Sequence, residues 1–380
     1  MGEQFLLRNY DRYPLSLEAG KGCYVWDDAG NRYLDFITGI GVNAFGYCHP
    51  RLTAALLEQA QRAVHFSNLV SHRDQEALAA RLCRISGMDR AFFSNSGTEA
   101  MEAALKAVRA RAVPGRSRLV ALHGSFHGRT MGSLSVTGQP CLRQRFVPSD
   151  VEVTFIAPND HAALEAAVAY DTAAVILEPV LGEGGIHPLD APFLQQARGL
   201  TRRVGALLIA DEVQCGLGRT GRHFAYQWAG ILPDIVVVAK PLAGGLPLGA
   251  TLFTEEAGQW LPPHSHGTTF GGGPLACRVA LEFLDLLEET MPQIEPLAAQ
   301  FLARLEWLRQ RHPVIREIRS KGLMFGIQLV EPARPFVQSA LGQGLLVNDT
   351  QETVLRLLPP YIIGETEMDD AVRVLDGVLP

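Results

Sequence analysis

Three apolar segments of this sequence each lead into a residue that can take part in acid–base or nucleophilic chemistry. TAAVILEPV contains Glu178, ALLIADEVQ contains Asp211 and DIVVVAKPL contains Lys240, so the three residues are 33 and 29 positions apart. Parallel strands joined by crossover connections recur at roughly this interval, about 30 residues per unit. Because the carboxyl ends of such strands meet at one edge of the sheet, we expect Glu178, Asp211 and Lys240 to lie close together.

Lys240 directly follows five apolar residues, Ile235 to Ala239, and precedes a glycine-rich segment. A partly buried lysine has a lowered pKa, so its neutral amine can attack a carbonyl group and form a Schiff base. Taken alone, Lys240 is more simply explained as the first polar residue after a strand. The two carboxylates that end the neighbouring strands favour the chemical interpretation.

A second candidate site lies where the strand AFFSN leads into SGTEAMEAALKAVR. Ser96 and Glu99 form an S-x-x-E capping box, which predicts a helix that stops at Pro114. The first turn of a helix has backbone N–H groups without intrahelical partners and carries the positive end of the helix dipole. The helix start at Ser96, Gly97 and Thr98 therefore suits a phosphate group, although capping boxes also begin many helices that bind nothing.

The alternation of strand and helix patterns through the middle of the chain predicts an α/β fold. We expect a large domain with a mostly parallel sheet flanked by helices, and a smaller α+β domain. The predicted parts are an N-terminal arm that belongs partly to the small domain (1–60), the large domain that carries the site (61–284) and the C-terminal small domain (285–380). Long helices are expected at about residues 275–287 and 295–311.

Composition excludes several classes of protein. The 380 residues are 47% hydrophobic and include 37 glycines, as in a folded globular protein. The net charge of −6, without a long basic run, argues against a nucleic-acid partner. No apolar segment approaches membrane-spanning length, and residues 1–14 lack the layout of a signal peptide. The six cysteines are scattered without a C-x-x-C pair, so we expect reduced thiols and a cytoplasmic location.

Two further patterns are misleading. GLGRTG, Gly216 to Gly221, matches the G-x-G-x-x-G of dinucleotide sites, but the sequence after it is a poor helix start and the acidic strand end, Asp211, comes before it. His123 and His127 are four positions apart, yet the glycines of HGSFHGR predict a loop and not a helix with metal ligands. We therefore expect neither a nicotinamide site nor a metal site.

Seven motifs occur in one order over nearly the whole chain: FFSNSGTEAMEAALKAVR, FHGRTMGSLSVTGQP, LEPVLGEGGIHP, ADEVQCGLGRTG, AKPLAGGLPLGA, HGTTFGGGPLAC and LRLLPP. With these motifs the chain resembles the class III, fold-type-I aminotransferases that use pyridoxal phosphate, and most closely the acetylornithine aminotransferases. The resemblance implies a homodimer with one cofactor per subunit and active sites built at the subunit interface.

The resemblance also implies roles for individual residues around the cofactor. Lys240 would hold it as a Schiff base and later carry a proton, Asp211 would pair with the ring nitrogen, and Phe126 would stack on the ring. Thr269 looks like the phosphate-binding threonine that comes from the partner subunit. The complete set of cofactor-binding residues would be Ser96, Gly97, Thr98, Phe126, Glu178, Asp211, Val213, Gln214, Lys240 and Thr269.

Substrate recognition would depend on arginine, because transaminase substrates are carboxylates and guanidinium binds them bidentately. Arg129 and Arg356 occupy the positions of the family's two carboxylate binders. Glu183 resembles a switch residue that pairs with Arg356 for one substrate and is displaced by glutamate for the other. The remaining residues that would approach the substrate are Tyr10, Ile40 and Thr268.

The implied reaction is transfer of the δ-amino group of N-acetylornithine to 2-oxoglutarate, as in arginine biosynthesis. Ile40 stands where ornithine δ-aminotransferases are expected to carry tyrosine, but 4-aminobutyrate enzymes are also apolar there. Succinylornithine, acetylated or carrier-linked lysine, ornithine and 4-aminobutyrate therefore stay open as donors. A non-catalytic or nicotinamide-dependent protein is the alternative from another class. Family members read closer to PVQGEGG, AKGLGGG and FGGNPLA, so Leu181, Pro241 and Gly273 are departures.

Overall fold

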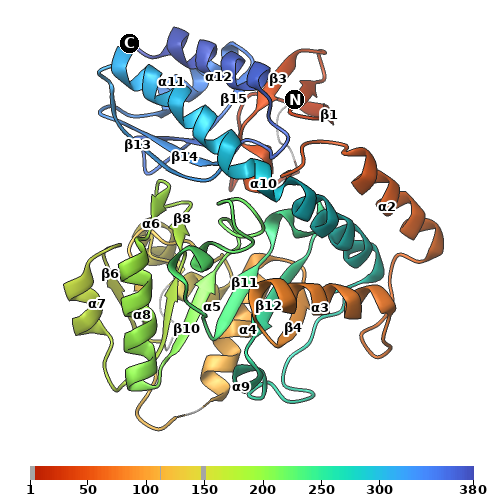
Figure 1. Ribbon diagram of the computed structural model, residues 1–380, viewed down its shortest axis with the longest axis vertical. Helices are drawn as coiled ribbons and strands as arrows, with labels where there is room; N and C mark the ends of the chain where they lie inside the picture. Colours follow the sequence, from red (N-terminus) through yellow and green to blue (C-terminus); the bar gives the residue numbers. More distant parts are fainter. Residues whose placement is uncertain (1–4, 112, 147–150) are drawn as a thin grey trace.

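Seven strands form the main sheet of the protein, whose computed structural model (Figure 1) describes residues 5–111, 113–146 and 151–380. Their order across the sheet is β4 (Arg90–Ser94), β12 (Gly249–Phe253), β11 (Ile235–Val238), β10 (Leu207–Asp211), β7 (Thr172–Leu177), β5 (Arg118–Leu122) and β6 (Val153–Ile156). The strands from β11 to β6 pair in parallel, and β12 is antiparallel to both of its neighbours. The sheet is therefore mostly parallel, as expected.

The central strands are apolar because both faces of the sheet are covered. In β11 the side chains of Ile235 and Val237 belong to one apolar cluster with helix α4 (Gly97–Ala110). Val236 and Val238 belong to another cluster, which includes helix α10 (Pro274–Arg311). Alternate side chains of a strand point to opposite faces. A continuous apolar run is thus the pattern that a doubly covered strand requires.

Helix α10 (Pro274–Arg311) is one continuous helix of 38 residues, and the prediction of two helices at about 275–287 and 295–311 is wrong. Pro292 and Pro296 lie inside it. An interior proline costs roughly 3 kcal/mol. Buried side chains such as Leu287 and Ile294 flank the first proline, so packing continues through the region where propensity alone predicts a break. In Figure 1 α10 runs from beside the main sheet to the upper part of the molecule.

The upper part of the molecule contains a second sheet, which we call the C-terminal sheet. Its strands are β13 (Ile315–Lys321), β14 (Met324–Leu329), β17 (Val354–Leu357) and β16 (Asn348–Thr350). Helices α11 (Arg334–Gly342) and α12 (Glu365–Val378) complete this part. The division of the chain at residues 60 and 284 stays a prediction, and α10 passes through residue 284.

A third sheet joins strands from the N-terminal part of the chain to one strand from the C-terminal part. The hairpin of β2 (Tyr24–Asp27) and β3 (Arg32–Asp35), together with β1 (Leu17–Lys21), is extended by β15 (Leu345–Leu346), which pairs in parallel with β3. The turn of this hairpin consists of Asp28 to Asn31. Helix α2 (Pro50–Arg62) comes next in the chain and contacts α10.

Short elements and connecting helices fill the remainder of the described chain. They are α1 (Thr38–Gly41), α3 (Arg73–Ser86), α5 (Met131–Ser135), α6 (Pro140–Arg143), η1 (Gln144–Phe146), α7 (His161–Ala167), β8 (Val180–Leu181), β9 (His187–Pro188), α8 (Ala191–Val204), η2 (Ala225–Ala229), η3 (Lys240–Ala243) and α9 (Glu255–Gly258). Among the described helices, none is long and apolar enough to cross a bilayer.

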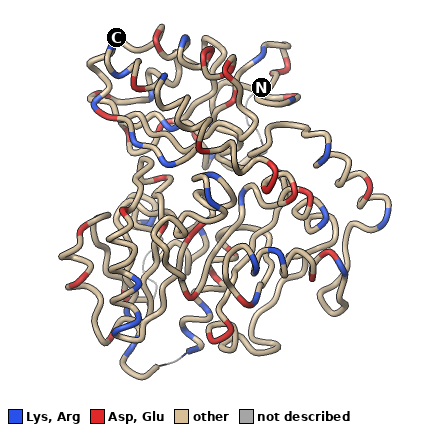
Figure 2. The backbone as a smooth tube through the Cα atoms, in the orientation of Figure 1, with Lys and Arg blue, Asp and Glu red and all other residues tan. Residues whose placement is uncertain are grey.

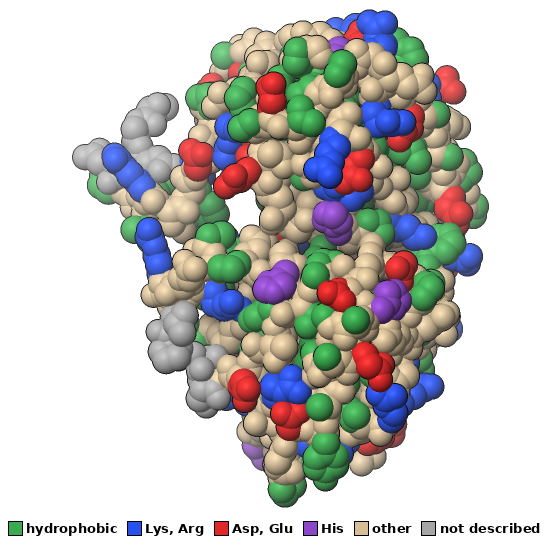
Figure 3. All heavy atoms as spheres, turned by 90° about the vertical axis from the view of Figure 1, so that its left-hand side faces the viewer, with side chains coloured by type: hydrophobic (Ala, Val, Ile, Leu, Met, Phe, Trp, Pro, Cys, Tyr) green, Lys and Arg blue, Asp and Glu red, His purple; other side chains and the backbone are tan. Residues whose placement is uncertain are grey.

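Charged side chains are distributed without a large patch of one sign on the views shown. Segments with Lys or Arg and segments with Asp or Glu are interspersed over the upper and the lower part of the backbone tube (Figure 2). The face in Figure 3 likewise carries basic, acidic and apolar side chains side by side.

Candidate active site

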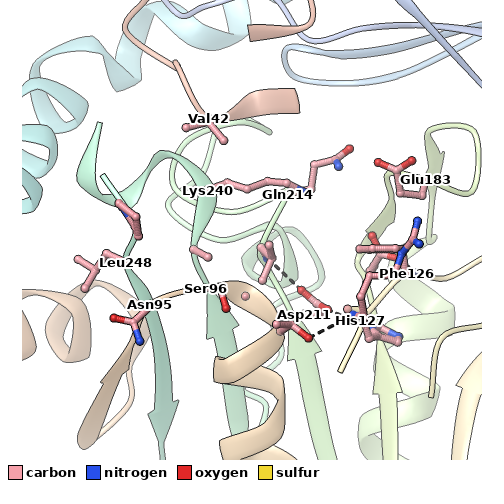
Figure 4. A pocket seen from close by; sticks show the side chains of 18 of the residues that line it. Val42, Asn95, Ser96, Phe126, His127, Glu183, Asp211, Gln214, Lys240 and Leu248 are labelled. Carbon is pink, nitrogen blue, oxygen red and sulfur yellow. Dashed lines mark hydrogen bonds and ion pairs between the residues drawn. The ribbon is translucent and has the colours of Figure 1, made fainter. Parts of the chain in front are cut away.

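Glu178, Asp211 and Lys240 line one cavity of about 400 Å³ at the carboxyl edge of the main sheet. They follow or end the parallel strands β7, β10 and β11, which are neighbours in the sheet. The structure thus brings together the three residues that the strand pattern singles out. Figure 4 shows Lys240 extended across the cavity toward Gln214, with Asp211 below it.

Lys240 has a strained backbone and a buried amine. Its φ of 38° lies in the left-handed region, which costs a residue with a side chain roughly 1–3 kcal/mol. Burial lowers the pKa of Lys240; Glu183 opposes this effect and Arg356 adds to it. The amine is therefore more easily neutral, and more nucleophilic, than a surface lysine.

Asp211 is held by two donors. Its Oδ2 lies 2.7 Å from His127 Nδ1, and its Oδ1 accepts a hydrogen bond of 3.0 Å from the backbone N–H of Val213. Both side chains of the Asp211–His127 pair are buried. Because a carboxylate only accepts, the proton of this bond is on His127 Nδ1. Asp211 is fixed in orientation as a negative group facing the cavity.

The sequence analysis missed His127, which it considered only as a metal ligand. The loop after β5 crosses β7 to reach Asp211 at the end of β10. The only hint in the sequence is general: a buried aspartate such as Asp211 needs a hydrogen-bond donor. This need does not identify His127 as the donor. No group of His, Cys, Asp and Glu that could hold a metal occurs among the described residues.

Glu178 fixes the loop that carries Phe126. Its Oε1 accepts a 2.8 Å hydrogen bond from the backbone N–H of Phe126, and its Oε2 accepts one of 3.1 Å from Gly182 N–H. Burial raises the pKa of Glu178 to about 7; His127 lowers it and Asp211 raises it. The Phe126 ring lines the cavity beside Asp211 (Figure 4).

The start of α4 also lines the cavity, because β4 delivers it to the same edge of the sheet. Ser96 Oγ accepts the backbone N–H of Glu99, as the capping box predicts, at 3.3 Å. The reciprocal bond is shifted by one residue, since Glu99 accepts the N–H of Asn95 and not that of Ser96. In the described chain no hydrogen bond uses the N–H groups of Gly97 and Thr98, which leaves two donors for an anion.

Glu183, which lines this cavity, forms an ion pair with Arg356, which lies behind the lining. Arg356 Nη1 lies 2.6 Å from Glu183 Oε1 and 3.4 Å from Gln214 Oε1, and Arg356 Nε donates to Asn348 Oδ1 at 3.2 Å. Burial acts to raise the pKa of Glu183, but Arg356 and Lys240 outweigh it and the net pKa is lowered. Arg356 is fully buried, and its Nη2 has no partner within the described part of the chain.

The remaining candidates for substrate contact lie in different surroundings. Arg129 is exposed at the cavity, with its guanidinium carbon 5.5 Å from the centre of the Phe126 ring. Tyr10 is 70% exposed on the N-terminal arm and does not line the cavity. Ile40 is also outside the lining, although its neighbour Val42 is part of it.

Thr268 and Thr269 do not line the cavity of their own chain. Thr268 is half-buried and accepts a 3.2 Å hydrogen bond from Asn95 Nδ2, while Thr269 is exposed. An exposed Thr269 is compatible with the expectation that it serves a partner's site. Its role, like those of Tyr10 and Ile40, stays a prediction.

Comparisons with known proteins are consistent with the lysine, carboxylates and arginines of this site. Residues 5–379 match the sequence model of a family described as "Aminotransferase class-III". The acetylornithine aminotransferase of Methanocaldococcus jannaschii is 42% identical over 99% of this chain and 96% of its own.

Two solved structures are similar. An ornithine aminotransferase from Toxoplasma gondii, described with partial occupancy of PLP at its active site, has a TM-score of 0.94 and 33% identity over 99% of this chain and 92% of its own. N-acetylornithine aminotransferase from Stenotrophomonas maltophilia has a TM-score of 0.85 and 33% identity over 97% of this chain and 96% of its own.

Proposed function

The chain belongs to the class III aminotransferases, and we propose that it transfers the δ-amino group of N2-acetyl-L-ornithine to 2-oxoglutarate. The products would be N-acetyl-L-glutamate 5-semialdehyde and L-glutamate, a step of arginine biosynthesis. The observation that carries the choice of substrate is the full-length match, at 42% identity, to an acetylornithine aminotransferase. The ion pair between Glu183 and Arg356 supports it from the structure.

The family implies pyridoxal phosphate as the cofactor, and the residues of the cavity fit this group. Gly97 and Thr98 offer two N–H groups at a helix start for the phosphate. Asp211 is a fixed carboxylate for the ring nitrogen, and Lys240 is a buried amine for the aldehyde. We propose one cofactor per subunit, attached to Lys240. When bound, it supplies an electron-withdrawing ring that stabilises a carbanion on the substrate.

The protein's own residues would then divide the work. Asp211, held by His127 and Val213, would face the ring nitrogen and favour its protonated form. The amine of Lys240 would take the proton from the carbon that bears the substrate amino group and return it in a later step. Phe126 and Val213 both line the cavity, and their apolar side chains would help to exclude water from it.

Substrate exchange would depend on the two arginines. Arg129 would bind the carboxylate of acetylornithine, while Arg356 stays paired with Glu183. Glutamate and 2-oxoglutarate bring a second carboxylate, which would displace Glu183 and use the free Nη2 of Arg356. One site could then accept a donor with one carboxylate and an acceptor with two.

A homodimer is part of the proposal, and exposed apolar side chains support it. Phe66, Leu69 and Val70 are exposed, as is Phe270. The two segments that carry them are neighbours, because Asn68 Nδ2 donates to the backbone oxygen of Thr268. Apolar surface beside Thr269 would suit a second copy, whose cavity Thr269 would complete.

The free thiols of all six cysteines agree with a cytoplasmic location, which we also propose.

Two measurements test the proposal. The purified protein with pyridoxal phosphate should absorb at about 400 nm, and Lys240→Ala should abolish attachment that borohydride can fix. A colourless protein would refute the cofactor assignment. A panel of amino donors with 2-oxoglutarate then tests the substrate. If 4-aminobutyrate or ornithine gives a higher kcat/KM than N-acetylornithine, the substrate assignment is wrong.

A further inference from the structure

The GLGRTG segment, Gly216 to Gly221, has no part in the site described so far, yet it contains one of the most buried charged residues. Arg219 is 1% exposed. Its Nη1 donates to the backbone oxygens of Leu323, at 3.3 Å, and Pro359, at 2.5 Å. Both acceptors come from the part of the chain that forms the C-terminal sheet, whereas Arg219 follows strand β10 of the main sheet.

Further contacts join the same segments. The backbone N–H of Leu323 donates to the oxygen of Arg219 at 2.9 Å, and Tyr361 Oη donates to the oxygen of Leu217 at 2.9 Å. The guanidinium carbon of Arg219 lies 4.6 Å from the centre of the Tyr361 ring. We call this set of five residues (Leu217, Arg219, Leu323, Pro359 and Tyr361) the Arg219 clasp.

The backbones at Gly322 and at Arg219 lie so close together that no side chain fits at position 322. Gly322 has a φ of 54°, and a Cβ on it would lie 2.5 Å from the backbone oxygen of Arg219 and from Thr220 Cα. A glycine is needed there for both reasons. The clasp is therefore a close backbone contact, with the Arg219 side chain passing through it.

Stability alone does not explain an arginine at this position. Among the residues that the structure describes, no carboxylate forms an ion pair with Arg219, and its Nη2 has no partner. Burial lowers the pKa of Arg219, and only the nearby Tyr361 opposes this effect. Apolar residues of similar volume often stabilise a protein as well as, or better than, buried charges. What the guanidinium adds is two directed bonds to two carbonyl groups.

Those bonds act on the segment that leads away from Arg356. Pro359 lies three residues after Arg356, and Leu358 and Tyr361 donate backbone hydrogen bonds of 2.7 and 2.6 Å to Phe36 and Ala44, which flank the loop with Val42. On its other side, Arg219 follows Asp211 and Gln214 in one compact turn. One side chain thus links the exits of β10 and β17, the strands that carry Asp211 and Arg356.

We propose that Arg219 is a positioning residue, which sets the distance of Arg356 from Lys240 and Asp211 so that Arg356 can bind the second carboxylate of glutamate or 2-oxoglutarate. This inference rests on the proposed function. It predicts that loss of the clasp impairs the half-reaction with the dicarboxylate and spares the half-reaction with the amino donor, in which Arg356 stays paired with Glu183.

The test compares Arg219→Met and Arg219→Lys with a control, Arg198→Met. Arg198 is also mostly buried, but its pair with Asp234 lies within the main sheet and its helix α8. Arg219→Met should raise the KM for 2-oxoglutarate about 10-fold with little change in the kcat/KM of the donor half-reaction. Arg219→Lys should restore part of the affinity, and Arg198→Met should change neither half-reaction. Equal losses in both half-reactions of Arg219→Met would overturn the proposal.

Hydrogen exchange of the protein gives a second measurement that needs no activity. Arg219→Met should increase deuterium uptake in peptides that cover residues 354–361 and 36–44, whereas Arg198→Met should not. Unchanged uptake there would refute the role of Arg219 in positioning. If the variants show these differences in uptake but the wild-type protein does not use 2-oxoglutarate, the proposed reaction is wrong. The Arg219 clasp would in that case still position Arg356.

Discussion

Glu183 Oε1 lies 2.6 Å from Arg356 Nη1, so a carboxylate of the protein itself occupies one of the two terminal nitrogens of a fully buried guanidinium. Glu183 comes from the turn between β8 and β9, next to the main sheet, and Arg356 from strand β17 of the C-terminal sheet. Glu183 therefore has the position of an internal competitor for any carboxylate that binds to Arg356.

Glu183→Gln should change the balance between the two substrates. Without the competing charge, 2-oxoglutarate should bind more tightly, and acetylornithine should react more slowly because Arg356 is left without its partner. We expect the ratio of the two kcat/KM values to shift by about 10-fold, measured as single half-reactions. Glu306→Gln, in an exposed pair with Arg309, is the control. An unchanged ratio would show that Glu183 has no part in substrate exchange.

Arg356→Ala should weaken the use of 2-oxoglutarate far more than cofactor binding. Truncating one partner of a buried charge pair costs about 2–5 kcal/mol, so we expect the KM for 2-oxoglutarate to rise at least about 30-fold. Cofactor binding, followed by absorbance, should stay within a few-fold of wild type. Equal loss of both properties would mean that Arg356 is structural.

The buried Glu212 should make the cofactor-free protein less stable as pH rises. Burial raises the pKa of Glu212 to about 7, although the N–H groups of Ala225 and Tyr226 lower it. Between its unfolded pKa and 7 the native state holds a proton that the unfolded state has lost. The resulting stability is fully present below about pH 4.5 and is lost as pH passes 7, with a range of about 3 kcal/mol.

Urea unfolding of wild type and Glu212→Gln at several pH values measures this effect. The wild type should lose stability between pH 5 and 8 relative to Glu212→Gln, while an exposed control, Glu256→Gln, should follow the wild type. Parallel curves for wild type and Glu212→Gln would contradict the raised pKa.

Leu69→Asp should disrupt the proposed homodimer. Leu69 is 94% exposed in the single chain, and a charge there would be buried without a partner in a dimer. Sedimentation velocity should show a shift toward monomer together with weaker cofactor binding, because Thr269 of the second copy would be lost. Val330→Asp, at an exposed apolar residue directly after β14 of the C-terminal sheet, is the control. A variant that sediments like the wild type would exclude this surface from the dimer contact.

The sequence predicts site residues best where they directly follow an apolar strand, because such a strand must be buried. Glu178, Asp211 and Lys240 could be placed together because apolar strands require cover on both faces and their ends share an edge. His127 could not, because its pairing depends on the order of strands β5, β7 and β10, which no local pattern encodes. The two helices predicted for this region form the single helix α10, because packing on both sides outweighs the local cost of its prolines.

The parallel pairing of β3 with β15 has a consequence for how this chain is made. Leu34 pairs with Leu345, so the hairpin near the N-terminus leaves the ribosome long before its partner strand exists. At roughly 5–20 residues per second, the wait is on the order of 15–60 seconds. Throughout that time β3 presents an unpaired strand edge, the kind of surface that recruits other chains. Slow synthesis at high expression should therefore favour aggregates that begin at the N-terminal hairpin.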